Sequence, residues 1–171
     1  MLLKCPCLNV GVHVQGGLSP LSGCAVAAEL LMDVLDDGRP LGVVFYIGAA
    51  MWAVGFLLEV IADSQKVAFR AKPDNRDRFI THGLWAWSQH PNYFGEILLW
   101  AGIAVIALPV LGGWSWAALI SPVFVLLLLL RVSGIPTLDR AAKAKWGDDP
   151  TYTDYKARTS KLIPLPPRRG A

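Results

Sequence analysis

The stretch Ser88-Gln89-His90-Pro91-Asn92-Tyr93-Phe94-Gly95-Glu96 decides how this sequence folds, because a polar segment runs directly into an apolar helix there. Pro91 suits the first turn of a helix, where its missing N–H would have no partner in any case. Asn92 and Glu96 are four residues apart and share one helical face, with Trp100 four residues further on. A carboxylate at the start of an apolar helix is expensive and is by default a functional feature. We therefore expect the functional site here.

Three apolar runs predict an all-α, multi-pass membrane helical bundle within one domain. They span residues 41–62, 93–108 and 114–131, and hydrophobic residues make up 54% of the 171-residue chain, more than is usual for a soluble domain. The first run is long enough to cross a hydrocarbon core roughly 30 Å thick. Pro109 and Gly112-Gly113 separate the last two runs, which predicts a tight hairpin between antiparallel helices. A buried helical pair in a soluble protein is the alternative, but few polar residues remain to coat it.

Basic residues are distributed unevenly, which predicts an orientation. Residues 63–92 contain five Lys or Arg residues and the tail from Arg131 onward contains nine, whereas residues 109–113 contain none. By the positive-inside rule, residues 63–92 and 132–171 are expected on the cytoplasmic side of an integral membrane protein, in the inner membrane if the cell is bacterial. The net charge of +3 then reflects membrane topology, and no basic–aromatic interleaving indicates a nucleic-acid partner.

Residues 1–40 form a poorly defined N-terminal segment. Cys5 and Cys7 lack a second Cys pair or a His cluster that would complete a metal site, and Cys24 is isolated. Residues 25–35 favour a short amphipathic helix that ends at Asp36-Asp37-Gly38. The chain's histidines show no i,i+4 pair, so we expect no bound metal.

Four charged residues at the end of the first apolar run share one helical stripe. With spacings of four, three and four, they are Glu59, Asp63, Lys66 and Arg70. Ordinary pairing, worth a few tenths of a kcal/mol per pair at a surface, explains the outer three. Such pairing does not explain Glu59, which lies inside the apolar run with no cation at helical spacing on its membrane side. We interpret the stripe as ligand-binding.

A second polar cluster follows across a short connection and consists of Arg76, Arg78, Asn92 and Glu96. Arginine offers a bidentate fork for phosphate oxygens. Carboxylates and an asparagine suit ribose hydroxyls and an amide. Together with the stripe, these residues predict a pocket at the membrane boundary for a large, anionic, hydroxyl-bearing cofactor. For Arg76 and Arg78 alone, contact with lipid headgroups is an equal alternative.

The remaining polar and aromatic residues have simpler interpretations. His90 precedes Pro91, which pushes its backbone towards extended geometry, and we expect its ring to cap the helix start. His82 lies in a turn. Trp85, Trp87 and Tyr93 are typical of an aromatic belt at the membrane interface, and a stacking role is compatible with it.

These motifs occur in an order that indicates a family. The elements are Leu57-Leu58-Glu59, Asp63, Phe69-Arg70, Gly83-Leu84-Trp85, the His90–Glu96 motif, Leu130–Pro136, Tyr152, Tyr155 and Leu162-Ile163-Pro164. In this order they resemble the C-terminal half of the steroid 5-alpha-reductase family, and most closely its bacterial membrane members of uncharacterised substrate. The resemblance covers Gly42 to Pro167 and marks residues 41–167 as one membrane domain, with 168–171 as a tail.

The resemblance implies a multi-pass helical protein that binds NADPH on the cytoplasmic side. Its family reduces a conjugated carbon–carbon double bond in a lipid or steroid-like substrate. The implied cofactor-binding residues are Glu59, Asp63, Arg70, Arg78, Asn92, Glu96 and Arg131, with Tyr93 and Trp100 lining the pocket near the nicotinamide. Membrane lipids are the other expected partners, and the oligomeric state is open.

The sequence departs from the family in three places. Glu59 stands where the animal enzymes have asparagine, and Ile135 stands where they have a histidine. The family's tyrosine and glutamate that bind the substrate carbonyl lie on N-terminal membrane helices, whereas residues 1–40 contain no tyrosine and no run of membrane length. No catalytic residue is therefore assigned. We expect a fragment, a mis-assigned start or a diverged activity, and little reductase turnover from this chain alone.

Two other functions remain open. Membrane methyltransferases of the isoprenylcysteine or phospholipid type, which use S-adenosylmethionine, have a similar Arg-His-Pro-x-Tyr element. Gln89 replaces that arginine here, and no Glu-Glu pair follows the last apolar run. A non-catalytic membrane remnant is the third possibility.

Overall fold

The computed structural model describes residues 42–111, 119–132 and 134–168, together with positions 32, 113 and 116. Within these ranges the chain is helical and contains no strand, which confirms the all-α prediction. The proposed helix at residues 25–35 and the three cysteines fall outside the described residues, apart from the single position 32.

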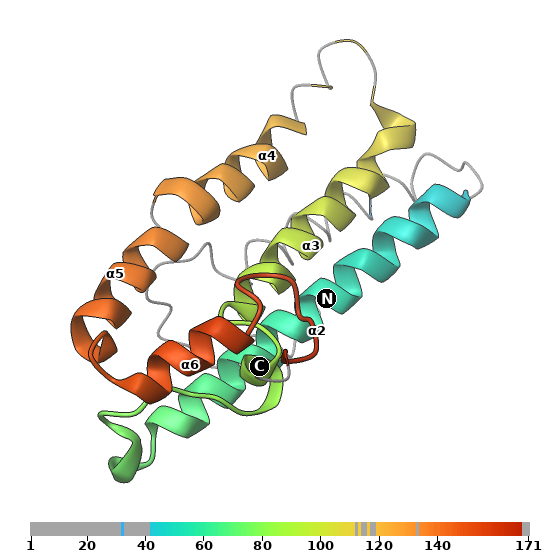
Figure 1. Cartoon of the computed structure of the whole chain (residues 1–171). Helices are drawn as coiled ribbons and strands as arrows, with labels where there is room; N and C mark the ends of the chain where they lie inside the picture. Colours follow the sequence, from blue (N-terminus) through green and yellow to red (C-terminus); the bar gives the residue numbers. More distant parts are fainter. Residues whose placement is uncertain are drawn as a thin grey trace.

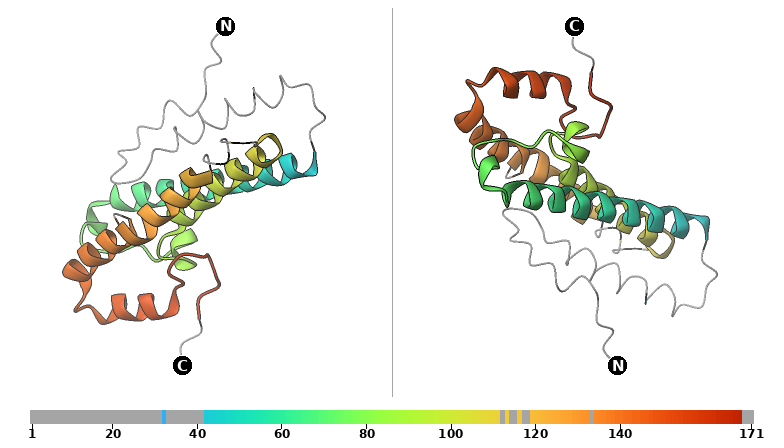
Figure 2. Two further views of the ribbon diagram at one scale, coloured as in Figure 1. Left: turned by 90° about the horizontal axis from the view of Figure 1, so that it is seen from above. Right: turned by 90° about the horizontal axis from the view of Figure 1, so that it is seen from below.

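Two antiparallel helices form the centre of the molecule. Helix α2 spans Val43–Arg70 and helix α3 spans Pro91–Ala107. They lie side by side along most of their length, and α4 (Ile120–Leu127) runs along the other side of α3 (Figures 1 and 2). Helices α5 (Ile135–Trp146) and α6 (Pro150–Arg158) gather at the end of the pair where α2 ends and α3 begins (Figure 1). Short 3₁₀ turns at Pro73–Asn75, Gly83–Ala86 and Leu108–Val110 occupy the connections.

Helix α2 is longer than its apolar run. It continues to Arg70, so the polar residues after Ala62 stay helical and the whole stripe lies on one rigid element. Pro73 follows the helix end, as expected because a proline disfavours helical geometry in the residue before it. Among the described helices, α2 is the one that is long and apolar enough to cross a membrane, whereas α3 is apolar but has 17 residues.

The third apolar run does not form the continuous helix predicted for 114–131. Positions 113, 116 and 119 have 3₁₀ geometry, and the α-helix begins at Ile120. Pro122 is the third residue of this α-helix, within the first turn, where its missing N–H would have no partner in any case; a helix that began at residue 114 would place the proline in its interior. After Leu127 the chain widens into a π-helical turn, Leu128–Val132, which contains Arg131.

Glycines bring α2 and α3 into close backbone contact. A Cβ atom on Gly55 would lie 2.6 Å from the carbonyl oxygen of Gly95, and one on Gly48 would lie 2.8 Å from that of Gly102. Real Cβ atoms do not approach backbone this closely, so any larger residue must separate the helices. Small residues are what apolar helix pairs use to pack without a hydrophobic driving force between them. The spacing of seven residues on both helices places each glycine pair on the same seam.

The connection before α3 is tied to both central helices and to the tail. The buried Trp85 donates its indole N–H to the carbonyl of Ala62 at 3.0 Å, and its own carbonyl accepts from the Tyr155 hydroxyl at 2.7 Å. Trp85 is therefore a structural anchor, and the interfacial-belt interpretation of this residue was wrong. Ser88 donates to the Leu162 carbonyl at 2.7 Å, which fixes the tail beside the start of α3.

Candidate functional site

Two glutamates are buried at the contact between α2 and α3. The exposed fractions of Glu59 and Glu96 are 5% and 4%. A Cβ on Gly95 would lie 2.6 Å from the backbone nitrogen of Glu59, so the close helix contact also draws the two glutamates together. Within the described part of the chain, Glu59 Oε2 and Glu96 Oε1 have no hydrogen-bond partner. Buried polar atoms are normally paired, so these two oxygens mark a place where a ligand donor fits.

One turn further out along α2, the stripe changes from acidic to basic. Burial raises the pKa of Asp63, and this rise is opposed by Lys66, by the side chain of Asn92 and by Arg70. The stripe residue Asp63 and the α3 residue Asn92 are therefore brought together, as the sequence predicted.

Lys66 does not form the ordinary ion pair proposed for the outer stripe. Its ammonium lies over the Trp85 ring, 5.3 Å from the ring centroid. Burial lowers the pKa of Lys66, the neighbouring Arg70 lowers it further, and Asp63 opposes both. No ion pair joins members of the stripe in the described residues.

A cavity of about 270 Å³ opens at the outer end of the stripe. It lies between the end of α2, the connection that leads to α3, and helices α5 and α6. Its basic lining consists of Lys66, Arg70, Arg78, Lys145 and Lys156, and its aromatic lining consists of Phe69, Phe79, Trp85, Trp146, Tyr152 and Tyr155. Among these bases, Lys66, Arg70 and Arg78 pair with no carboxylate of the described residues, whereas Lys145 pairs with Asp77 and Lys156 with Asp139. Among the described residues, the cavity therefore offers three cations that form no ion pair and lie beside aromatic faces.

A larger hollow of about 780 Å³ lies on another side of Arg78, against α6. It is lined by residues of the 77–86 connection and of α6, and no residue of α2 or α3 borders it. We place the functional site at the smaller cavity because, of these two hollows, it is the one bordered by stripe residues, namely Lys66 and Arg70.

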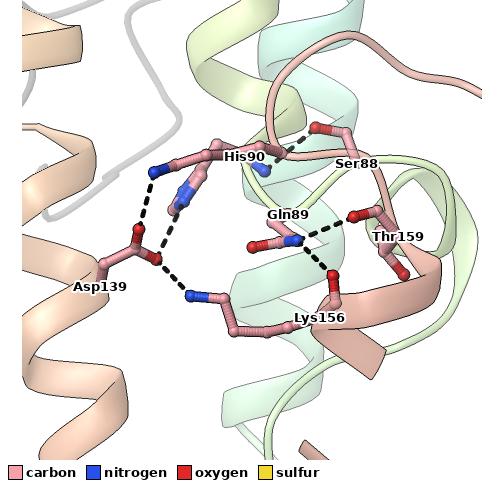
Figure 3. Close-up of polar contacts among 7 residues, drawn as sticks. Ser88, Gln89, His90, Asp139, Lys156 and Thr159 are labelled. Carbon is pink, nitrogen blue, oxygen red and sulfur yellow. Dashed lines mark hydrogen bonds and ion pairs between the residues drawn. The ribbon is translucent and has the colours of Figure 1, made fainter. Parts of the chain in front are cut away.

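His90 lines the small cavity, and its ring points towards Asp139 (Figure 3). Its Nε2 lies 3.8 Å from Asp139 Oδ1, too far for a hydrogen bond, while Lys156 Nζ reaches the same oxygen at 2.9 Å. The ring does not cap α3, contrary to prediction, since no side-chain cap bond forms at this helix start. Burial lowers the pKa of His90 to about 4; Asp139 opposes the shift, and Lys161, Lys156 and Lys66 add to it. The imidazole is therefore neutral near pH 7.

Asp139 connects α5 to α6 and to the segment that follows it. Its Oδ1 accepts from Lys156 and its Oδ2 lies 3.1 Å from Lys161 Nζ. Burial alone would raise the pKa of Asp139, but the hydrogen bonds and charges of the two lysines hold it below its ordinary value. The side-chain amide of Gln89 donates to the carbonyls of Lys156 and Thr159 (Figure 3).

The protein should lose stability as the pH falls from 6.5 to about 4, because only the unfolded chain takes up a proton at His90 in this window. The loss is on the order of 3 kcal/mol from this residue. Thermal unfolding in detergent between pH 4 and pH 7 would measure it. His90→Gln should flatten the profile, whereas the matched variant His82→Gln, at an exposed ring, should leave it unchanged. A profile that His90→Gln does not alter would contradict this assignment.

The structure places the sequence-predicted residues in three groups. Glu59, Asp63, Asn92 and Glu96 come together at the α2–α3 contact, and Arg70 and Arg78 line the cavity outside it. Tyr93 is buried in a cluster with Leu129 and Ile135, and Trp100 packs against that cluster. Arg131 is exposed in the π-helical turn and borders neither hollow described above.

Sequence reasoning missed the contribution of α5 and α6. Lys145, Trp146 and Lys156 line the cavity, and Asp139 binds Lys156 there, yet the tail was interpreted only through its charge and its family motifs. The available signal was the spacing of Tyr152 and Lys156, which puts an aromatic ring and a cation on one helical face.

A comparison with family models gives one match. The model described as Protein of unknown function (DUF1295) matches residues 21–159, most of the chain. The chain belongs to this family.

Curated relatives connect the family to the steroid 5-alpha-reductases and confirm the resemblance, at low identity. The chain is 34% identical over 92 residues to 3-oxo-5-alpha-steroid 4-dehydrogenase 1 of Homo sapiens, covering 54% of this chain and 32% of that protein. The Bos taurus protein of the same name is 31% identical over 97 residues, 57% of this chain and 34% of the relative. Steroid 5-alpha-reductase DET2 of Arabidopsis thaliana is 34% identical over 89 residues, 51% of this chain and 31% of the relative.

The chain matches about a third of the length of these relatives. No solved structure matches it.

Proposed function

We propose that this chain is the cofactor-binding part of a membrane-embedded, NADPH-dependent reductase of conjugated carbon–carbon double bonds. One observation carries the proposal. At the α2–α3 contact, two buried carboxylates with unpaired oxygens, one from each helix, are followed outward by Lys66 and Arg70 of α2 and Arg78 of the connection, which form no ion pair among the described residues. This order of charges complements a molecule that has an amide and hydroxyls at one end and phosphates at the other.

The residues present fit this cofactor. Arg70 and Arg78 would hold phosphate oxygens, for which the guanidinium fork is suited. Glu59 and Glu96 would accept hydrogen bonds from the carboxamide and ribose, which would pair their orphaned oxygens. Small-molecule pockets usually measure roughly 300–1,000 Å³. The cavity of about 270 Å³ lies just below this range and borders the basic residues but neither glutamate, so it would hold the phosphate end of a dinucleotide, and the nicotinamide end is proposed to lie at the carboxylates.

The protein's contribution to the chemistry would be binding and electrostatics. Bound NADPH would supply a hydride, and the balanced reaction converts an enone, NADPH and a proton into a saturated ketone and NADP⁺. The buried carboxylates would orient the nicotinamide end and exclude water from it. Tyr93 and Trp100 would form the apolar wall of the same region, and Arg131 remains a proposed cofactor residue on the resemblance alone.

The substrate is proposed to be a lipid or steroid-like enone. The names of the curated relatives refer to 3-oxo steroids, which are apolar ketones. An apolar substrate would reach the carboxylate end through the hydrocarbon region, because much of the surface of α2 is apolar and exposed there.

Arg78→Ala should weaken NADPH binding by about 1.5–3 kcal/mol, the loss of a charge-assisted hydrogen bond. It should weaken NADH binding less if the guanidinium holds the 2′-phosphate. Calorimetric titration of the purified chain in detergent would measure both affinities. The matched control is Arg76→Ala, because Arg76 lies on the same connection, is exposed and does not line the cavity.

Three outcomes would overturn the proposal. Equal affinity for NADH and NADPH in the wild type would remove the case for a 2′-phosphate site. Preferential binding of S-adenosylmethionine would instead assign the chain to the membrane methyltransferases. Binding of none of these ligands would favour a non-catalytic membrane protein.

The cofactor side is proposed to be cytoplasmic, in an integral multi-pass protein. A single cysteine at position 74, in a variant without the native cysteines, should resist membrane-impermeant maleimide added to intact cells and react after lysis. Position 74 is exposed, whereas the side chain of the neighbouring Asn75 bonds to the Phe69 carbonyl and should be kept. The expectation rests on the positive-inside rule, because Lys and Arg residues are concentrated around position 74. Labelling from outside intact cells would reverse the orientation.

A further inference from the structure

The two buried glutamates come from adjoining positions of α2 and α3. A Cβ on Gly95, the neighbour of Glu96, would lie 2.6 Å from the backbone nitrogen of Glu59. Both are at least 95% buried, and each has an oxygen without a partner among the described residues. Like-charged carboxylates that share a poorly solvated site retain a proton between them.

The neighbouring charged groups strengthen this conclusion. Asp63, on α2, adds a third carboxylate near both glutamates, and Tyr93, on α3, is a further titratable group near Glu96. The nearest bases lie further out, where Lys66 faces the Trp85 ring and His90 faces the cavity. Arg131, in the π-helical turn that follows α4, is exposed. No cation of the described residues forms an ion pair with Glu59 or Glu96.

We propose that Glu59 and Glu96 share one proton, and that this pair releases it when the nicotinamide beside it is in its oxidised form. The inference rests on the proposed function. The ring of NADPH is neutral, so the pair keeps its proton and offers one donor and one acceptor to the carboxamide. The ring of NADP⁺ carries a positive charge, which stabilises the doubly ionised pair. Binding of NADP⁺ to the singly protonated protein therefore gives the complex and releases one proton to solvent.

The ionisation of the Glu59–Glu96 pair thus depends on the charge of the nicotinamide ring. Its net negative charge would grow as the ring becomes positive, which is the direction that stabilises hydride departure. A neutral amide at position 59 could not respond in this way, so Glu59 gives this chain a property that asparagine, its counterpart in the animal enzymes, would lack.

Calorimetry in buffers of different ionisation enthalpy would measure the number of protons released when each nucleotide binds. With the full chain in detergent near pH 7, NADP⁺ should release close to one proton more than NADPH does. The affinity for NADP⁺ should also rise with pH, by up to about tenfold per unit, while that for NADPH should not. Glu59→Gln and Glu96→Gln should each abolish the difference. Asp148→Asn, at an exposed carboxylate, should preserve it.

The outcomes separate the two proposals. If both nucleotides bind the wild type with equal proton release, the shared proton is refuted and the proposed function stands. A difference that persists in both glutamine variants would likewise refute it, because the proton would come from another group. If neither nucleotide binds, the proposed function fails and the shared proton fails with it. The wild-type measurement decides the question even if a variant does not fold.

Discussion

Gly55→Leu is expected to separate α2 from α3 and to destabilise the fold by about 3 kcal/mol or more. Even a single added carbon would lie 2.6 Å from the Gly95 carbonyl oxygen, and the remaining atoms of a leucine would have no space in the helix contact. Overpacking of a close contact typically costs 1–3 kcal/mol, and here the obstacle is backbone, which cannot change rotamer. Glycine is less favourable than leucine in a helix interior by about 1 kcal/mol, so the substitution gains that much helix propensity. The net effect on the free energy of unfolding is still destabilising.

The measurement is thermal unfolding in detergent together with disulfide crosslinking between cysteines placed on the two helices. Ala50→Leu is the matched control, because Ala50 is exposed on the same helix. It should leave both the midpoint and the crosslink unchanged. A Gly55→Leu protein with the midpoint and crosslink of the wild type would show that the helices do not depend on this contact.

Glu96→Gln is expected to weaken NADPH binding by roughly 10- to 100-fold. The substitution removes one carboxyl of a buried pair that carries a negative charge, and a hydrogen bond to a charged group contributes about 1.5–3 kcal/mol. Membrane insertion should not change, since the side chain keeps its shape. Fluorescence titration with NADPH gives the affinity.

A structural role for Glu96 predicts the opposite result. In that case Glu96→Gln would leave nucleotide affinity intact, and Glu96→Leu would stabilise the fold by removing a buried, unpaired carboxylate. Asp148→Asn is the control for a general effect of lost negative charge, because Asp148 is exposed. If Asp148→Asn weakens NADPH binding as much as Glu96→Gln does, the effect is long-range electrostatics and the proposed contact is wrong.

The helices of the centre were predictable because their signals are local. The apolar run after Leu41 and the proline at the start of α3 specify two helices whatever surrounds them. The same holds for the stripe from Glu59 to Arg70, since a period of 3.6 residues fixes which side chains share a face. The start of the third helix was missed because it depends on one proline and not on hydrophobicity.

The partners across the cavity were not predictable. Arg78 and Lys156 are far apart in sequence, and no local rule places them on the same cavity. That placement depends on specific long-range contacts, such as the hydrogen bond from Tyr155 to the Trp85 carbonyl and the one from Ser88 to Leu162. The sequence shows the donors but not which of many possible acceptors they reach.

By itself, then, the sequence determined the helices, the faces they present and the charge order along α2, because these follow from composition and helical periodicity. Only the tertiary structure decided that glycine pairs bring Glu59 and Glu96 together and that an oxygen of each has no partner among the described residues. It also decided that α5 and α6 complete a basic cavity around Arg70 and Arg78. The physical reason is that burial and pairing are properties of side chains on different elements, which are set by packing and not by the order of residues along one helix.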